Sequence, residues 1–168
     1  FIHEMCRYHV TYLQRLYERA LRDVRFDFIF LWEDMAYKNG PLISPAFARE
    51  FMLPYYREMI GFYRSMGARW IVQDSDGDMT QLVPLFAEVG VDAMLPFEVA
   101  AGMDPLRIRE AFPKLRIIGG VDKRALIAGP AAIDRELEAK LPALFAQGGT
   151  IPTVDHHVPP EVSYANFQ

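Results

Sequence analysis

The chain alternates short apolar runs with longer stretches whose apolar residues recur at helical spacing, and this alternation constrains the fold more than any other feature. Neighbouring parallel strands need a long return connection, usually a helix, whereas antiparallel strands can be joined by a tight turn. We therefore expect an α/β fold with a parallel sheet and right-handed crossovers. The five expected strands are 26–32, 70–73, 93–97, 115–118 and 150–154.

The stretches between the strands carry helix start and stop signals. Ser44 and Pro45 open a helix that runs to about Ser65, and Pro54 must kink or split it before Gly67 ends it. Asp104 caps a short helix that ends before a proline. The remaining helices are expected over 5–21, 79–89 and 130–147.

Two local patterns predict how the first elements are buried. The apolar residues of 5–21 fall at helical spacing with arginines and glutamates between them, which predicts one buried stripe and one wet face. The run 26–32 is almost continuously apolar, which is typical of a strand covered on both sides. The expected buried stripe is Met5, Tyr8, Tyr12, Leu16 and Ala20.

Composition narrows the class of protein. With 168 residues and 51% hydrophobic content, the chain can bury one core, so we expect a single domain over 1–168. A net charge of −4 with scattered Lys and Arg gives no reason to expect nucleic acid as a partner. The lone Cys6 and the lack of an export signal favour the cytoplasm, and no apolar run approaches the roughly 20 residues that span a membrane. Because the chain starts inside a helical pattern, we expect a piece of a longer protein.

Acidic residues follow every expected strand. In parallel α/β folds the ligand site lies just beyond the carboxyl ends of the strands, so these side chains are expected to converge on one mouth. Crowded carboxylates repel, and they need a cation, shared protons or a metal. Any single Asp can also be a turn or cap residue, as we expect for Asp78 and Asp104. The strand-end acids are Glu33, Asp34, Asp74, Asp76, Glu98, Asp122 and Asp155.

Two histidines follow the last expected strand. His156 and His157 can act as acid–base groups or metal ligands, or can simply lie in a turn. His3 and His9 are expected to be surface or helix residues, and Cys6 a small buried hydrophobe. The Gly119-Gly120 pair could cradle an anion but equally permits a tight turn.

The ordered set of motifs resembles the uroporphyrinogen decarboxylase superfamily. That superfamily includes the decarboxylase of haem synthesis and methyltransferases that move methyl groups to or from corrinoid proteins. The resemblance implies a (β/α)₈ TIM-barrel, of which this chain is a partial barrel holding strands four to eight. It rests on Asp34 with Gly40-Pro41 and Ser44-Pro45, Asp76-Gly77, Pro96-Phe97-Glu98, Gly119-Gly120-Val121-Asp122, and Asp155-His156-His157 before Asn166.

The resemblance also implies site residues. The zinc-binding histidine and cysteines of the coenzyme M methyltransferases fall near Asp74, Asp76 and His156, so the thiolate zinc site is absent. An oxygen and nitrogen site for zinc, manganese or iron could use Asp76, Glu98 and His156, with Asp155 as the alternative to His156. The expected catalytic residues are His156, Asp76 and Asp34, and the expected substrate-binding residues are Glu33, Asp74, Glu98, Asp122 and His157.

Two functions follow from the resemblance, and a third, non-catalytic alternative follows from the partial barrel itself. The first is methyl transfer with a corrinoid carried by a partner protein and a small-molecule methyl donor. The second is decarboxylation of uroporphyrinogen or a related tetrapyrrole, although an acidic mouth would repel such a polycarboxylate. The third is a non-catalytic fragment whose open sheet edges and apolar surface favour a homodimer.

Overall fold

A computed structural model describes residues 1–168. It contains a five-stranded sheet in the order β1-β4-β5-β6-β7, and every neighbouring pair is parallel. The predicted α/β fold with a parallel sheet is confirmed, and the arrangement is consistent with a partial barrel. The strands are β1 (Phe28–Trp32), β4 (Trp70–Asp74), β5 (Ala93–Leu95), β6 (Arg116–Ile118) and β7 (Thr150–Ile151).

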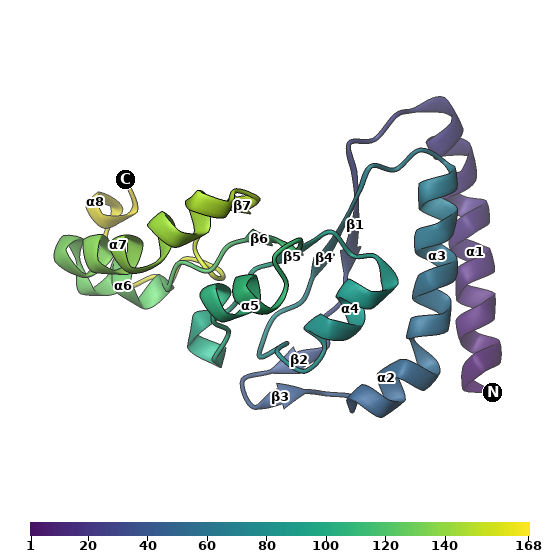
Figure 1. Cartoon of the computed structure of the whole chain (residues 1–168), viewed down its shortest axis with the longest axis horizontal. Coiled ribbons are helices and arrows are strands. Elements are labelled where there is room, and N and C mark those ends of the chain that lie inside the picture. Colours follow the sequence, from purple (N-terminus) through teal and green to yellow (C-terminus); the bar gives the residue numbers. More distant parts are fainter.

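Helices connect successive strands of the sheet (Figure 1). A small antiparallel hairpin of β2 (Ala36–Tyr37) and β3 (Gly40–Pro41), which the sequence did not predict, lies beyond the end of β1. The helices are α1 (Ile2–Asp23), α2 (Pro45–Phe51), α3 (Leu53–Ser65), α4 (Val83–Val89), α5 (Pro105–Ala111), α6 (Lys123–Ala128), α7 (Pro130–Gln147) and α8 (Tyr164–Phe167), with a 3-10 turn η1 (Val99–Ala101).

The helix boundaries follow local chemistry. The Ser44 hydroxyl accepts a hydrogen bond from the Phe47 backbone N–H and caps α2, and the predicted split near Pro54 falls between α2 and α3. The helix expected over 79–89 begins only at residue 83: residues 80–82 form a turn, and Pro84 sits in the first helical turn. Gly90 ends it with a φ of 98°, which favours glycine.

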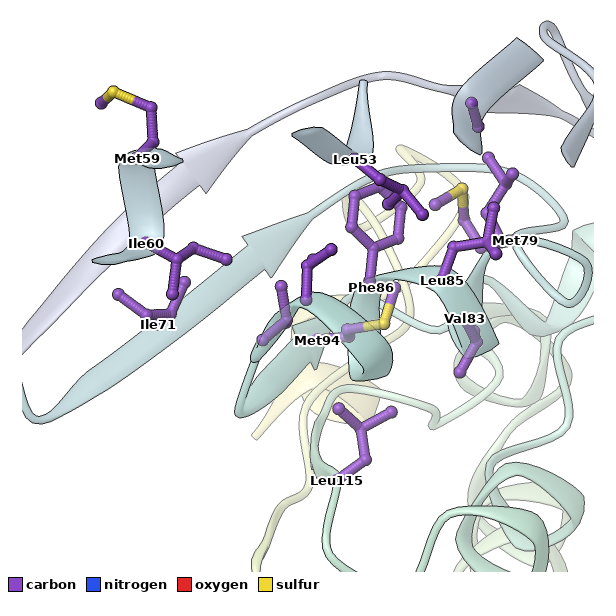
Figure 2. Packing of buried hydrophobic residues seen from close by; sticks show 14 of the residues in the cluster. Leu53, Met59, Ile60, Ile71, Met79, Val83, Leu85, Phe86, Met94 and Leu115 are labelled. Atoms are coloured by element: carbon purple, nitrogen blue, oxygen red, sulfur yellow. The ribbon is translucent and has the colours of Figure 1, made fainter. Parts of the chain in front are cut away.

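The core lies between the sheet and the helices α3 and α4 (Figure 2). Ile60 from α3 and Phe86 from α4 belong to one cluster with Ile71 from β4 and Met94 from β5. Each fully buried side chain of this size contributes about 1.5 to 3 kcal/mol relative to exposure. This core fixes β4 and β5, and therefore the loops that follow them.

The buried face of α1 is not the predicted one. The predicted stripe is exposed along its whole length, with Tyr8 at 76% exposure. Cys6, Val10 and Leu13 instead belong to or pack against the core on the side facing α3. Since α1 carries apolar residues on two faces, the helical period alone could not decide which face docks.

Strand β1 is also less covered than predicted. Its side chains alternate, with Phe28, Phe30 and Trp32 exposed and Ile29 and Leu31 partly buried. Strand β1 is an edge strand, and its helices cover only the face that carries Ile29 and Leu31. On the other face, here called the inner face of the sheet, the β1 side chains are exposed, whereas Val72 of β4 and Ala93 of β5 are buried.

None of the helices combines the length and the apolar character that crossing a bilayer requires.

Candidate active site at the strand ends

A histidine and a carboxylate meet across the strand ends. His156 Nε2 lies 2.9 Å from Asp76 Oδ2, although the two residues are 80 positions apart in the chain. A carboxylate can only accept a hydrogen bond, so Nε2 carries the hydrogen and Nδ1 is left free. Asp76 therefore orients the His156 ring and, when the ring is neutral, favours the tautomer with its hydrogen on Nε2.

A second pair stands beside the first. Lys123 Nζ lies 2.8 Å from Glu98 Oε1, and the Gly77 backbone N–H donates to Glu98 Oε2 at 3.1 Å. Burial raises the pKa of Glu98, but the Lys123 ammonium and the Gly77 N–H together outweigh it and hold that pKa below its ordinary value. His156 acts in the same direction. Glu98 is thus kept ionised by its partners.

Asp74 behaves in the opposite way. Burial raises the pKa of Asp74, and the negative charges of Asp76 and Asp34 raise it further, while His156 opposes them. The structure therefore brings Asp34, Asp74, Asp76, Glu98 and His156 into one electrostatically coupled group, here called the mouth cluster.

Close backbone packing holds the loops of the mouth cluster. A Cβ on Gly77 would lie 2.5 Å from the Ala36 carbonyl oxygen, and one on Gly119 would lie 2.0 Å from the Pro96 oxygen. Phe97, which precedes Glu98, adopts a φ of 58° and is buried. A non-glycine residue rarely takes this conformation, so the fold must enforce it. The loop that carries Glu98 is therefore tightly constrained.

Asp155 has a structural role in this conformation. It is fully buried and accepts backbone N–H bonds from Val99 at 2.7 Å, Ala100 at 3.4 Å and Lys123 at 3.0 Å. These bonds tie the loops after β5, β6 and β7 together. Both oxygens are already used, so Asp155 does not fit the role of alternative metal ligand.

Three further predicted site residues do not join the mouth cluster. Glu33 lies on the face of β1 that is covered by helices, near Tyr56. Asp122 accepts the Arg124 backbone N–H as the cap of α6 and pairs with the Arg124 side chain. His157 is exposed, and its ring meets His156 edge-on at 4.7 Å. Their predicted substrate contacts have no geometric support in the structure and stay predictions.

The expected cap residues are confirmed. Asp78 accepts from the Thr80 N–H, and Asp104 accepts from the N–H groups of Leu106 and Arg107 at the start of α5.

Sequence reasoning missed Lys123 and the Gly77 N–H as parts of the site. The acids at the strand ends called for a cation, and Lys123 directly follows the acid at the end of β6. The position of Lys123 next to Asp122 therefore indicated a candidate cation for the site. The Gly77 contact depends on a backbone orientation that no sequence pattern reports.

The predicted three-ligand metal set does not assemble in this structure. No group of three or more His, Cys, Asp or Glu side chains is arranged to hold a metal ion. Glu98 is already paired with Lys123, which leaves Asp76 and His156 as two donors facing each other. This donor set does not fit a zinc, manganese or iron centre. We derive no reaction step from a metal.

The largest cavity, of about 910 Å³, lies at the opposite end of the strands. Arg64, Arg109 and Arg116 line it, but each has a partner: Asp92, the carbonyls of the Gly148-Gly149 turn, and the Trp70 ring, respectively. Reaction sites of parallel barrels occupy the carboxyl ends of the strands. We therefore place the chemistry at the mouth cluster.

Comparison with protein families gives one match. The family model described as uroporphyrinogen decarboxylase (URO-D) matches residues 10–168, which include every residue of the mouth cluster. No curated protein matches the chain.

Proposed function

We propose that this chain, which belongs to the uroporphyrinogen decarboxylase family, serves methyl transfer to or from a corrinoid protein at its mouth cluster. The family supports an enzyme related to its decarboxylases and methyltransferases. The choice of methyl transfer between those two activities is our proposal, and it rests on the charge of the mouth.

The charge balance of the mouth cluster carries the proposal. The mouth cluster contains four carboxylates: Asp34 and Asp76 both raise the pKa of Asp74, and Glu98 is paired with Lys123, the one ammonium bonded to the cluster. Two like charges about 4 Å apart repel by roughly 1 kcal/mol in water and about 4 kcal/mol at a protein surface. Such a mouth disfavours a polycarboxylate tetrapyrrole and favours a neutral or cationic methyl donor.

The side chains suit proton handling around a transferred methyl group. Asp76 holds the His156 ring with Nδ1 free, so that Nδ1 can take a proton from an acceptor or return one. Asp74 and Glu98 have pKa values shifted in opposite directions, which separates a carboxyl that keeps its proton more readily from one that stays ionised. A corrinoid on a partner protein would supply the methyl–cobalt chemistry.

One assay separates the competing activities. The chain is incubated with methylcobalamin and a thiol acceptor, and loss of the methyl–cobalt absorbance is followed, while uroporphyrinogen turnover is measured in parallel. We expect methyl transfer that falls about 100-fold or more in His156→Ala and Asp76→Asn. Asp134→Asn, an exposed carboxyl on α7, is the matched control. Decarboxylation without methyl transfer would contradict the proposal.

The non-catalytic alternative has its own observation. The inner face of the sheet is exposed at its two edge strands, with Trp32 of β1 at 76% exposure and Ile151 of β7 at 59%. If neither activity appears while the chain is folded, this alternative is favoured over both enzymes.

Metal binding is tested separately. After equilibration with zinc, manganese or iron and removal of free metal, elemental analysis compares the native chain with Asp76→Ala and His156→Ala. The geometry predicts no stoichiometric metal in any of the three proteins. Bound metal that both substitutions remove would restore the metal hypothesis.

A further inference from the structure

A second cavity lies on the other side of β1 from the mouth cluster. It has a volume of about 440 Å³ and is formed by α1, α3 and the end of β1. Figure 1 shows α1 and α3 lying side by side next to β1. Its walls are mostly apolar, with Val10 and Leu13 from α1, Leu31 from β1 and Met59 from α3. We call it the α1–α3 cavity.

Glu33 is the one carboxylate that lines this mostly apolar space, and His9 and three tyrosines line it as well. Tyr56 is the tyrosine next to Glu33. Its hydroxyl is buried, interacts with the Glu33 side chain outside ideal hydrogen-bond geometry and has no other partner. Glu33 belongs to none of the ion pairs in the chain.

Tyr56 is the neighbour that offers Glu33 a hydrogen bond, and no ion pair includes Glu33. A half-buried carboxylate that lacks an ion-pair partner loses free energy relative to water. Burial accordingly raises the pKa of Glu33 and the negative charge of Asp34 raises it further, while Tyr56 and His9 oppose these effects. A ligand ammonium at this point would give Glu33 the ion pair that it lacks, in addition to the influence of His9.

The aromatic side chains in the cavity walls also favour a cationic ligand. Phe51, Tyr55, Tyr56 and Tyr63 place aromatic side chains around the cavity. Aromatic faces attract cations as well as apolar groups. An apolar cavity with one acid and one hydroxyl at its end is a common form of small-molecule site.

We propose that the α1–α3 cavity binds a small hydrophobic amine, with its apolar part between α1 and α3 and its ammonium group on Glu33, which the buried Tyr56 hydroxyl holds in place. The site is distinct from the mouth cluster, because side chains alternate along an extended chain and Glu33 and Asp34 therefore point to opposite faces. It does not depend on the function proposed above.

The test uses three probes that share a phenylethyl skeleton and differ in charge. Binding of 2-phenylethylamine, 2-phenylethanol and 3-phenylpropanoate is measured by calorimetry at about pH 8, where a primary ammonium stays protonated. We expect the amine to bind at least about 10-fold more tightly than the alcohol, and the acid to bind most weakly. Equal affinity for the amine and the acid, or no binding at millimolar concentration, overturns the proposal.

Variants locate the site. Glu33→Gln keeps the shape and should abolish the preference for the amine, and Tyr56→Phe should weaken amine binding several-fold. Glu138→Gln, an exposed residue on α7, is the control. Asp76→Asn should leave amine binding unchanged. If Asp76→Asn removes the preference and Glu33→Gln does not, the amine binds at the mouth cluster and the proposal fails.

The single cysteine gives a readout that needs no variant. Cys6 lines the α1–α3 cavity and is partly buried. Bound amine should slow alkylation of Cys6 by iodoacetamide in the native chain, with half-protection at the calorimetric dissociation constant. An alkylation rate that saturating amine leaves unchanged would also overturn the proposal.

Discussion

At the scale of single residues, Glu33 predicts a pH dependence of stability. Burial raises its pKa above 4.5, so its contribution to stability is fully present below that pH and is lost as the pH rises through the raised value. Glu33→Gln removes this titration. We expect the stability of Glu33→Gln relative to the native chain to increase from about pH 4 to about pH 7, measured by urea unfolding. A difference that does not change with pH would contradict this prediction, and Glu138→Gln, at an exposed position on α7, is the control for the substitution itself.

Asp155 differs from Glu33, because its buried carboxylate accepts hydrogen bonds from three backbone N–H groups. Asp155→Asn replaces one acceptor oxygen by a donor that faces a backbone N–H. Hydrogen bonds to charged groups are worth about 1.5 to 3 kcal/mol each, so we expect a loss of about 2 to 3 kcal/mol in the free energy of unfolding. Urea unfolding measures it, with Asp134→Asn as control. An unchanged stability would mean that Asp155 does not hold the three loops together.

At the scale of the elements, Gly77 links the β2–β3 hairpin to the loop after β4. Gly77→Ala would set a Cβ 2.5 Å from the Ala36 carbonyl oxygen, at a φ of +79°. Gly67→Ala is a matched control, because Gly67 has a φ of +94° but nothing within 4 Å of its Cβ position. Both substitutions should lower the free energy of unfolding by about 1 kcal/mol, because alanine disfavours the left-handed backbone. Gly77→Ala should lower it by about 1 to 3 kcal/mol more, because of the clash with the Ala36 carbonyl oxygen.

The Gly77 loop affects both the stability of the fold and the position of Glu98 in the mouth cluster. The Gly77 N–H holds Glu98, so a displaced loop should reduce methyl transfer in Gly77→Ala more than in Gly67→Ala. Thermal unfolding and the methylcobalamin assay on the same two proteins make this comparison. Equal stability and equal activity of the two variants would remove the argument for tight loop packing.

At the scale of the whole molecule, the exposed side of the edge strand β1 predicts self-association. Phe28, Phe30 and Trp32 expose one apolar side of an edge strand, and such strands are prone to pair. We expect sedimentation to show a homodimer or larger species that grows with concentration. Phe30→Lys should reduce it, whereas Phe145→Lys, an exposed Phe on α7, should not. A monomer at all concentrations would contradict the expectation.

The sequence determined the parallel α/β fold, the positions of its strands and most of its helix ends. These depend on local periods and on cap and turn residues such as Ser44, Gly90 and Asp104, whose chemistry acts within a few positions of the chain. It also placed acids after every strand. That Asp34, Asp74, Asp76, Glu98 and His156 meet followed from parallel strands ending at one edge.

Only the tertiary structure decided which of those acids serve the site. Asp155 became a buried clamp, Asp122 a cap and Glu33 part of the α1–α3 cavity, because each role depends on what the neighbouring element presents to that side chain. The same reason applies to α1. The sequence does not distinguish its two apolar faces, and only the packing of α3 against one of them shows which face is buried. Periodic patterns in a sequence report local structure, so they do not predict contacts between segments that are far apart in the chain.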